Sequence, residues 1–159
     1  MPIAGMIFWA IVAVAGLYVK PVQLAYIVGF GSGMIFPLGV LIDLVTTRKM
    51  KRANAANPVT QLFMQCLGLV ALVWPLVIIA ASLAHNANLI VLGGAILMAI
   101  IWIPYGWAAD DPVGLQHAVG RSVLSYAAYL FAPNPYKATA IAVVVLLSYL
   151  YSLLRMRRP

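Results

Sequence analysis

The sequence predicts an all-α membrane protein, a compact bundle of six transmembrane helices that forms a single domain over residues 1–159. Hydrophobic residues make up 65% and charged residues 8% of the chain, whereas soluble domains have roughly 45–50% and about 25%. The apolar residues form continuous runs, unlike the alternating strands of transmembrane barrels. This composition excludes a soluble enzyme, a disordered chain and a nucleic-acid binder.

The runs predict helices at about 3–19, 22–46, 60–84, 89–108, 115–132 and 138–154, close to the length that a bilayer requires. The first run has no Lys or Arg before it, so we interpret it as a retained helix and not as a signal peptide. Lys20 and Pro21 precede the second helix, and the polar segment 47–58 separates it from the third.

Short polar segments separate the remaining helices. HNAN at 85–88 ends the third helix, and ADDPVG at 109–114 ends the fourth. PNPYK at 133–137 ends the fifth, and the sixth begins directly after it. These connections leave no room for a soluble domain.

The basic residues predict the orientation. Only Lys20 and Lys137 lie on one side of a six-helix topology. The other side carries Arg48, Lys49, Lys51, Arg52, Arg155, Arg157 and Arg158. The positive-inside rule then places both termini in the cytoplasm. The partner is therefore the lipid bilayer, and the two basic clusters are suited to attract anionic lipids.

Polar side chains from three helices are predicted to lie at one depth near the cytoplasm. Ionisable residues inside spans usually face the bundle, and equal depth predicts a salt bridge from Asp43 to Arg121. Residues four apart share a helical face. The cluster is Asp43, Gln61, Gln65, His117 and Arg121, with Trp102 near the same level. It is either a polar ligand site or a set of bonds that only holds the bundle together, and Trp102 either walls that site or packs in the core.

Small residues and prolines inside the runs predict helix packing. Gly29 and Gly33 form a GxxxG pattern, which favours close helix contact. Pro37 and Pro75 lie in mid-span and are expected to kink their helices. The alternative is a broken helix that lines a substrate cavity.

Catalytic and metal-binding patterns are absent from the sequence. It contains no glutamate, no HExxH or GxSxG motif and no clustered Cys/His set, so we assign no catalytic residue, metal or cofactor. The stretch from Asp110 to Arg121 holds two acids, a histidine and an arginine, which keeps a lipid-modifying enzyme open as an alternative.

Three segments, VGFGSGMIFPLGVL at 28–41, NPVTQLF at 57–63 and WIPYGW at 102–107, resemble a family of small bacterial multi-pass inner-membrane proteins without assigned function. The resemblance implies a bacterial inner-membrane protein and adds no chemistry. The favoured hypothesis is binding or translocation of a small solute or amphiphile through a cytoplasm-facing polar site. A structural or accessory subunit, a lipid-modifying enzyme and a homodimer stay open, and no nucleic-acid partner is expected.

Overall fold

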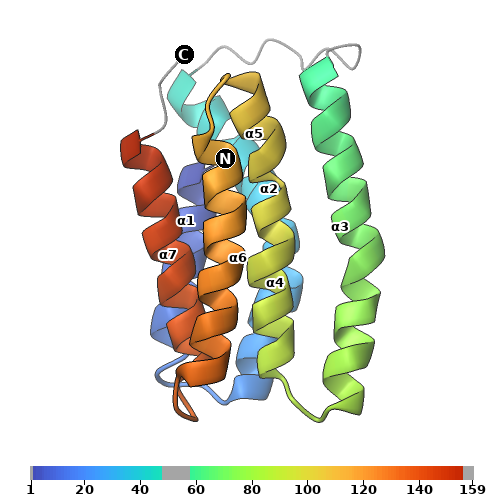
Figure 1. Ribbon diagram of the computed structural model, residues 1–159, viewed down its shortest axis with the longest axis vertical. Helices are drawn as coiled ribbons and strands as arrows, with labels where there is room; N and C mark the ends of the chain where they lie inside the picture. The colour runs from blue at the N-terminus through green and yellow to red at the C-terminus, as the bar shows by residue number, and fades with distance from the viewer. Residues whose placement is uncertain (1, 48–57, 156–159) are drawn as a thin grey trace.

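A computed structural model describes residues 2–47 and 58–155, with side chains for all of these except residues 2, 36–47 and 60. The all-α prediction is confirmed, since the described residues form helices and turns and contain no strand (Figure 1). The helices are α1 (Pro2–Ala15), α2 (Pro21–Thr47), α3 (Pro58–Leu83), α4 (Asn88–Ile100), α5 (Trp102–Ala108), α6 (Val113–Phe131) and α7 (Lys137–Arg155).

The helix predicted at 89–108 consists of two helices, α4 and α5, which follow one another in the same direction (Figure 1). The backbone leaves the regular α-helix at Ile101. Pro104 explains the break, because proline has no N–H to donate to the carbonyl of Ile100, four residues earlier. The interruption comes directly before Trp102 and so sets the position of that side chain.

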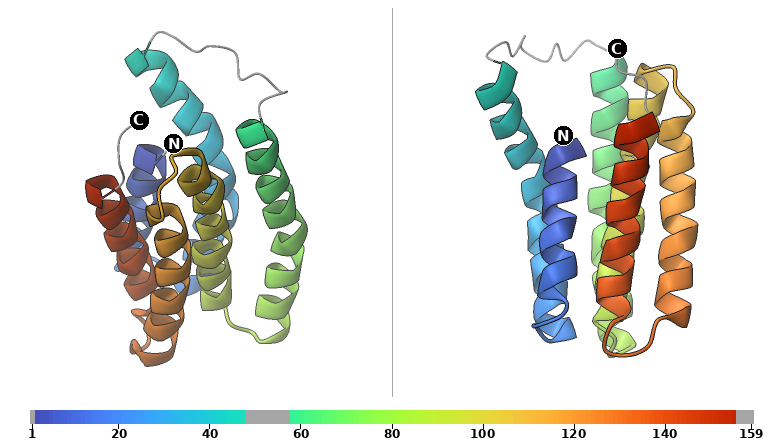
Figure 2. Two further views of the ribbon diagram at one scale, coloured as in Figure 1. Left: turned by 45° about the horizontal axis from the view of Figure 1, so that its top comes forward. Right: turned by 90° about the vertical axis from the view of Figure 1, so that its left-hand side faces the viewer.

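The helices run side by side and alternate in direction, apart from the α4–α5 pair. α1 begins and α7 ends at the same end of the bundle, which we call the terminal end (Figures 1 and 2). The turns after α1, α3 and α6 lie at the opposite end. Three segments of the described chain are long and apolar enough to cross a membrane: Gln61–Leu83, Asn88–Ala108 and Lys137–Arg155.

The core lies between α1, α2, α4 and α7. Its members include Trp9, Val28, Val91, Ile141 and Val145, all fully buried. α6 packs against α4, α5 and α7, whereas in the described part of the chain α3 makes its main contacts with α4 and α5. Just 11% of the α3 span is buried, against 50% of Asn88–Ala108. α3 therefore stands at the edge of the bundle with most of its apolar surface exposed.

A glycine pair fixes α5 tightly against α6. A Cβ added to Gly106 would lie 2.8 Å from both the carbonyl oxygen of Asp111 and the Cα of Gly114. A Cβ added to Gly114 would collide with the carbonyl oxygen of Trp102. Asp111 accepts a hydrogen bond from the Val113 N–H at 2.9 Å and so caps the start of α6. The close approach brings the buried face of α6 next to Trp102.

Candidate functional site

Three ring side chains from three helices form an aromatic cluster in the interior. Trp102 of α5 stacks on His117 of α6, with ring centroids 4.0 Å apart and planes at 17°. Tyr149 of α7 meets both rings edge-on, at 5.4 Å from Trp102 and 5.3 Å from His117. All three side chains are buried. The cluster therefore joins α5, α6 and α7 through ring contacts away from solvent.

His117 is held in one orientation by α7. Its Nδ1 lies 3.0 Å from the Ser148 carbonyl oxygen and 2.6 Å from the Ser152 hydroxyl oxygen. Because a carbonyl oxygen only accepts hydrogen bonds, this geometry fits an Nδ1–H that donates to α7. The buried Nε2 has no hydrogen-bond partner in the described part of the chain. One ring nitrogen thus fixes the ring, and the other is left without a partner.

Arg121 lies one turn further along α6 and is fully buried. Its guanidinium carbon is 5.4 Å from the ring centre of Trp9 on α1 and 5.5 Å from that of Tyr149. Both distances are within the range of cation–π attraction. Among the residues described, none makes a well-formed hydrogen bond with Nε, Nη1 or Nη2 of this side chain, although the Tyr149 hydroxyl is a polar neighbour of the charge. Two aromatic side chains therefore surround the guanidinium, and no carboxylate of the described residues pairs with it.

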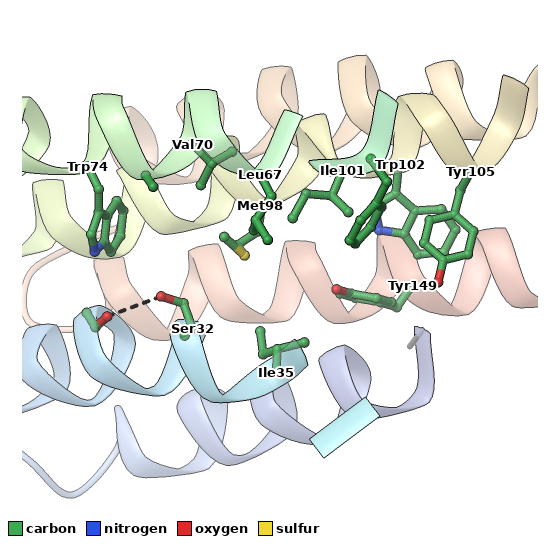
Figure 3. Close-up of a pocket in the computed structure, with 14 residues that line it drawn as sticks. Ser32, Ile35, Leu67, Val70, Trp74, Met98, Ile101, Trp102, Tyr105 and Tyr149 are labelled. Carbon is green, nitrogen blue, oxygen red and sulfur yellow. Dashed lines mark hydrogen bonds between the residues drawn. The ribbon is translucent and has the colours of Figure 1, made fainter. Parts of the chain in front are cut away.

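An apolar cavity of about 420 Å³ lies between α2 and α3, next to this cluster (Figure 3). Trp102, Tyr105 and Tyr149 lie at one end and Trp74 at the other. The one hydroxyl of α2 at the cavity, Ser32 Oγ, donates to the carbonyl oxygen of Gly29 at 3.2 Å. The remaining lining is aliphatic or aromatic: Ile35, Phe63, Leu67, Val70, Ala71, Met98 and Ile101. Such a wall suits an apolar chain.

A second cavity, of about 700 Å³, continues the space between α2 and α3 toward the end opposite the termini. Gly29 and Trp74 line both cavities, so the two meet at these residues. Ala25, Ile78 and Ile90 are among the apolar residues of the second cavity, which reaches His85. The separation of α2 from α3 thus leaves an apolar groove that follows most of α3.

The sequence profile of DUF7010, a family of unknown function, matches residues 1–157. The chain belongs to this family. No curated protein and no solved structure matches it. The expectation of a family without assigned function is confirmed, whereas the bacterial origin stays a prediction. Membership in DUF7010 assigns no activity, so any function has to be argued from the geometry.

The structure brings together three of the six predicted ligand residues, Trp102, His117 and Arg121. Gln61 and Gln65 are exposed on α3 and do not line the cavity. Asp43 lies within α2, but its side chain is outside the described residues, so its salt bridge to Arg121 stays a prediction. Among the described side chains of the predicted polar level, those in the interior therefore come from α6, with Trp102 contributed by α5.

The glycines of α2, Gly29 and Gly33, lie in contact with no other helix among the described residues, so their predicted role in helix packing stays a prediction. A Cβ added to Gly29 or Gly33 would meet no atom within 4 Å, and both residues line the cavity. The alternative role, lining a cavity, fits these positions, although α2 is continuous and not broken. Pro75 lies exposed inside α3, and the side chain of Pro37 is outside the described residues.

Sequence reasoning missed Trp9, Trp74 and Tyr149. Each stands in a long apolar run, where an aromatic residue faces lipid or core equally well. Tyr149 and Ser152 are three residues apart and so share a helical face near the end of a mostly aliphatic run. This polar pair is the signal that would have marked the side of α7 that faces His117.

Proposed function

We propose that this protein crosses the bacterial inner membrane six times, with both termini in the cytoplasm, and binds an amphiphile in the cavity between α2 and α3. The alternating directions of the helices and the three apolar spans support a multi-pass arrangement. Arg155 ends α7 at the terminal end, whereas Lys20 and Lys137 lie at the other end. Together with the basic residues at 48–52, this distribution favours a cytoplasmic terminal end.

The observation that carries the ligand proposal is the apolar wall of the 420 Å³ cavity. Among the described lining residues, a small polar solute would find few hydrogen-bonding groups: the Ser32 hydroxyl, which already donates to its own helix, and the polar atoms of the tyrosine and tryptophan rings. An alkyl chain would instead bury its surface against Phe63, Trp74 and Met98. Within the predicted class of small solutes and amphiphiles, the cavity therefore favours an amphiphile that enters from the lipid between α2 and α3.

The topology is tested with a matched pair of cysteines in a Cys66→Ala background. Ala108 and Ala84 are both exposed and lie at opposite ends of the bundle. Ala108→Cys is expected to react with a membrane-impermeant maleimide only after the cells are opened, and Ala84→Cys in intact spheroplasts. Labelling of Ala108→Cys from outside would reverse the orientation, and labelling of both from one side would refute the six-span topology.

The cavity is tested with dibromostearyl alcohol, whose bromines quench tryptophan fluorescence on contact. The protein carries Trp107→Phe and is purified in a neutral detergent. Trp107 is 61% exposed, so probe bound nonspecifically at the surface would quench its fluorescence. Gly33→Leu places a side chain in the cavity, whereas Gly120→Leu places one in open space on α6, away from it. Quenching should saturate, weaken at least tenfold in Gly33→Leu and remain in Gly120→Leu. Equal quenching in both variants would refute the proposal.

A further inference from the structure

We propose that the amphiphile is anionic and that Arg121 binds its charged group, a phosphate or carboxylate carried on the apolar chain. This inference rests on the proposed function, because the cavity supplies the site for the chain. Three observations support it: the buried guanidinium without an anionic partner among the described residues, the donors around it, and the single aromatic ring that both meets Arg121 and lines the cavity.

The first observation concerns charge. Transferring a guanidinium from water to a protein interior is costly, and buried charges are normally paired. Cation–π contacts with Trp9 and Tyr149 offset part of that cost. The N–H groups of Arg121 make no well-formed hydrogen bond with the described residues. Within that part of the chain, the buried guanidinium therefore has no anionic partner.

The second observation concerns the neighbouring groups. The indole nitrogen of Trp9, a donor only, is also buried without a partner among the described residues. The guanidinium and the indole N–H are both hydrogen-bond donors. Phosphate and carboxylate groups accept two parallel hydrogen bonds from a guanidinium. The described side chains near Arg121 include no carboxylate that would fill this role. Among the described residues, the site therefore supplies several donors and no anionic acceptor.

The third observation concerns access. Tyr149 lies 5.5 Å from the guanidinium by its ring centre, and the same residue lines the cavity with Trp102 (Figure 3). Its hydroxyl lies against Gly5 of α1, where even a Cβ would collide with it. Tyr149 thus contacts both the aromatic end of the cavity and Arg121. The proposal requires this ring to move so that one molecule can place its chain in the cavity and its charge at Arg121.

The experiment compares probes that share one brominated chain and differ in charge: dibromostearyl phosphate, dibromostearyl alcohol, and a phosphatidic acid with two dibromostearoyl chains in phosphatidylcholine nanodiscs. Quenching is titrated in the Trp107→Phe protein and in its Arg121→Gln, Arg121→Lys and Asp43→Asn variants. Arg155→Gln is the matched control, because it removes an exposed positive charge at a helix end. The alcohol alone reports whether the cavity binds a chain.

The expected result is that the phosphate binds at least tenfold more tightly than the alcohol. Arg121→Gln should remove this preference and leave alcohol binding unchanged, Arg121→Lys should keep part of it, and Arg155→Gln should keep all of it. Without a probe, Arg121→Gln should melt no lower than its parent, because it removes a buried charge that lacks an anionic partner among the described residues. Binding of phosphatidic acid would identify a bilayer lipid as the source, and binding of the single-chain phosphate alone a free amphiphile.

Equal affinity of the phosphate and the alcohol in the parent protein would overturn the anion site and leave the cavity proposal intact. Failure of the alcohol to bind would overturn the proposed function and, with it, this inference. The Asp43→Asn variant tests the alternative that Asp43 is the anionic partner of Arg121. If it and Arg121→Gln each lower the melting temperature and the double variant restores it, the anion is the carboxylate of Asp43 and the ligand proposal is wrong.

Discussion

The two sides of the bundle use small and polar residues in opposite ways. Where α6 meets α5 and α7, Gly106 and Gly114 allow backbones to touch, and His117 and Arg121 are enclosed by rings. Where α2 faces α3, Gly29 and Gly33 border the cavity, and Gln61 and Gln65 are exposed on α3. The same residue types therefore lie in a tightly packed interface around α6 and beside a cavity between α2 and α3.

This difference indicates a tightly packed half that encloses Arg121 and a peripheral helix, α3, that borders the cavity. α1, α6 and α7 are packed along their lengths, whereas the described residues of α3 make their main contacts with α4 and α5. Apart from the charge of Arg121, the loss or crowding of a packed contact should cost stability, and a matched change at an exposed or open position should not. The predictions below test this contrast from the largest expected effect to the smallest.

The largest contrast is expected between two aliphatic truncations. Ile141 on α7 is fully buried, whereas Leu72 on α3 is 76% exposed. Ile141→Ala should lower the free energy of unfolding by about 2–5 kcal/mol, because it opens a hole in a packed core. Leu72→Ala should change it by less than about 0.5 kcal/mol. Denaturation in mixed micelles measures both, and similar losses would show that α3 is as tightly packed as α7.

An intermediate contrast is expected between two glycines of α6. Gly114→Ala introduces a methyl group against the backbone of α5, which should cost about 1–3 kcal/mol of stability. Gly120→Ala has open space at the same atom and should be neutral or gain up to about 1 kcal/mol from the helix preference of alanine. Melting temperatures of both variants in one detergent decide the matter, and a stable Gly114→Ala protein would argue against the close α5–α6 contact.

The smallest contrast is expected between two serines. Ser152 of α7 bonds to Nδ1 of His117 across helices, whereas Ser82 of α3 donates to the carbonyl oxygen of Ile78 on its own helix at 2.8 Å. Ser152→Ala should cost about 1 kcal/mol, since it removes one buried bond while the Ser148 carbonyl still holds the ring. Ser82→Ala should lie within about 0.5 kcal/mol of the parent protein. A larger loss of stability for Ser82→Ala than for Ser152→Ala would indicate that α3, and not α7, is the more tightly packed helix.

Much of the fold follows from the sequence alone. The continuous apolar runs predicted an all-helical chain, and most helix boundaries agree within a few residues. Two helices differ more from the prediction. α1 ends at Ala15, before the predicted end at residue 19, and Pro104 divides the predicted helix 89–108 at Ile101. The helical period also placed His117 and Arg121 on one face, and both are buried. Composition and local spacing determine these features because they depend on neighbours along the chain.

Only the tertiary structure decided which faces meet. Nothing in the sequence distinguished Gln61 and Gln65, which are exposed, from His117 and Arg121, which are enclosed, or linked Trp9 and Tyr149 to the arginine. In a soluble protein, the contrast between polar and apolar faces reports which side is buried. Lipid is as apolar as the protein interior, so close packing of shapes and hydrogen bonding select the partners of a membrane helix, and an apolar run does not record that choice.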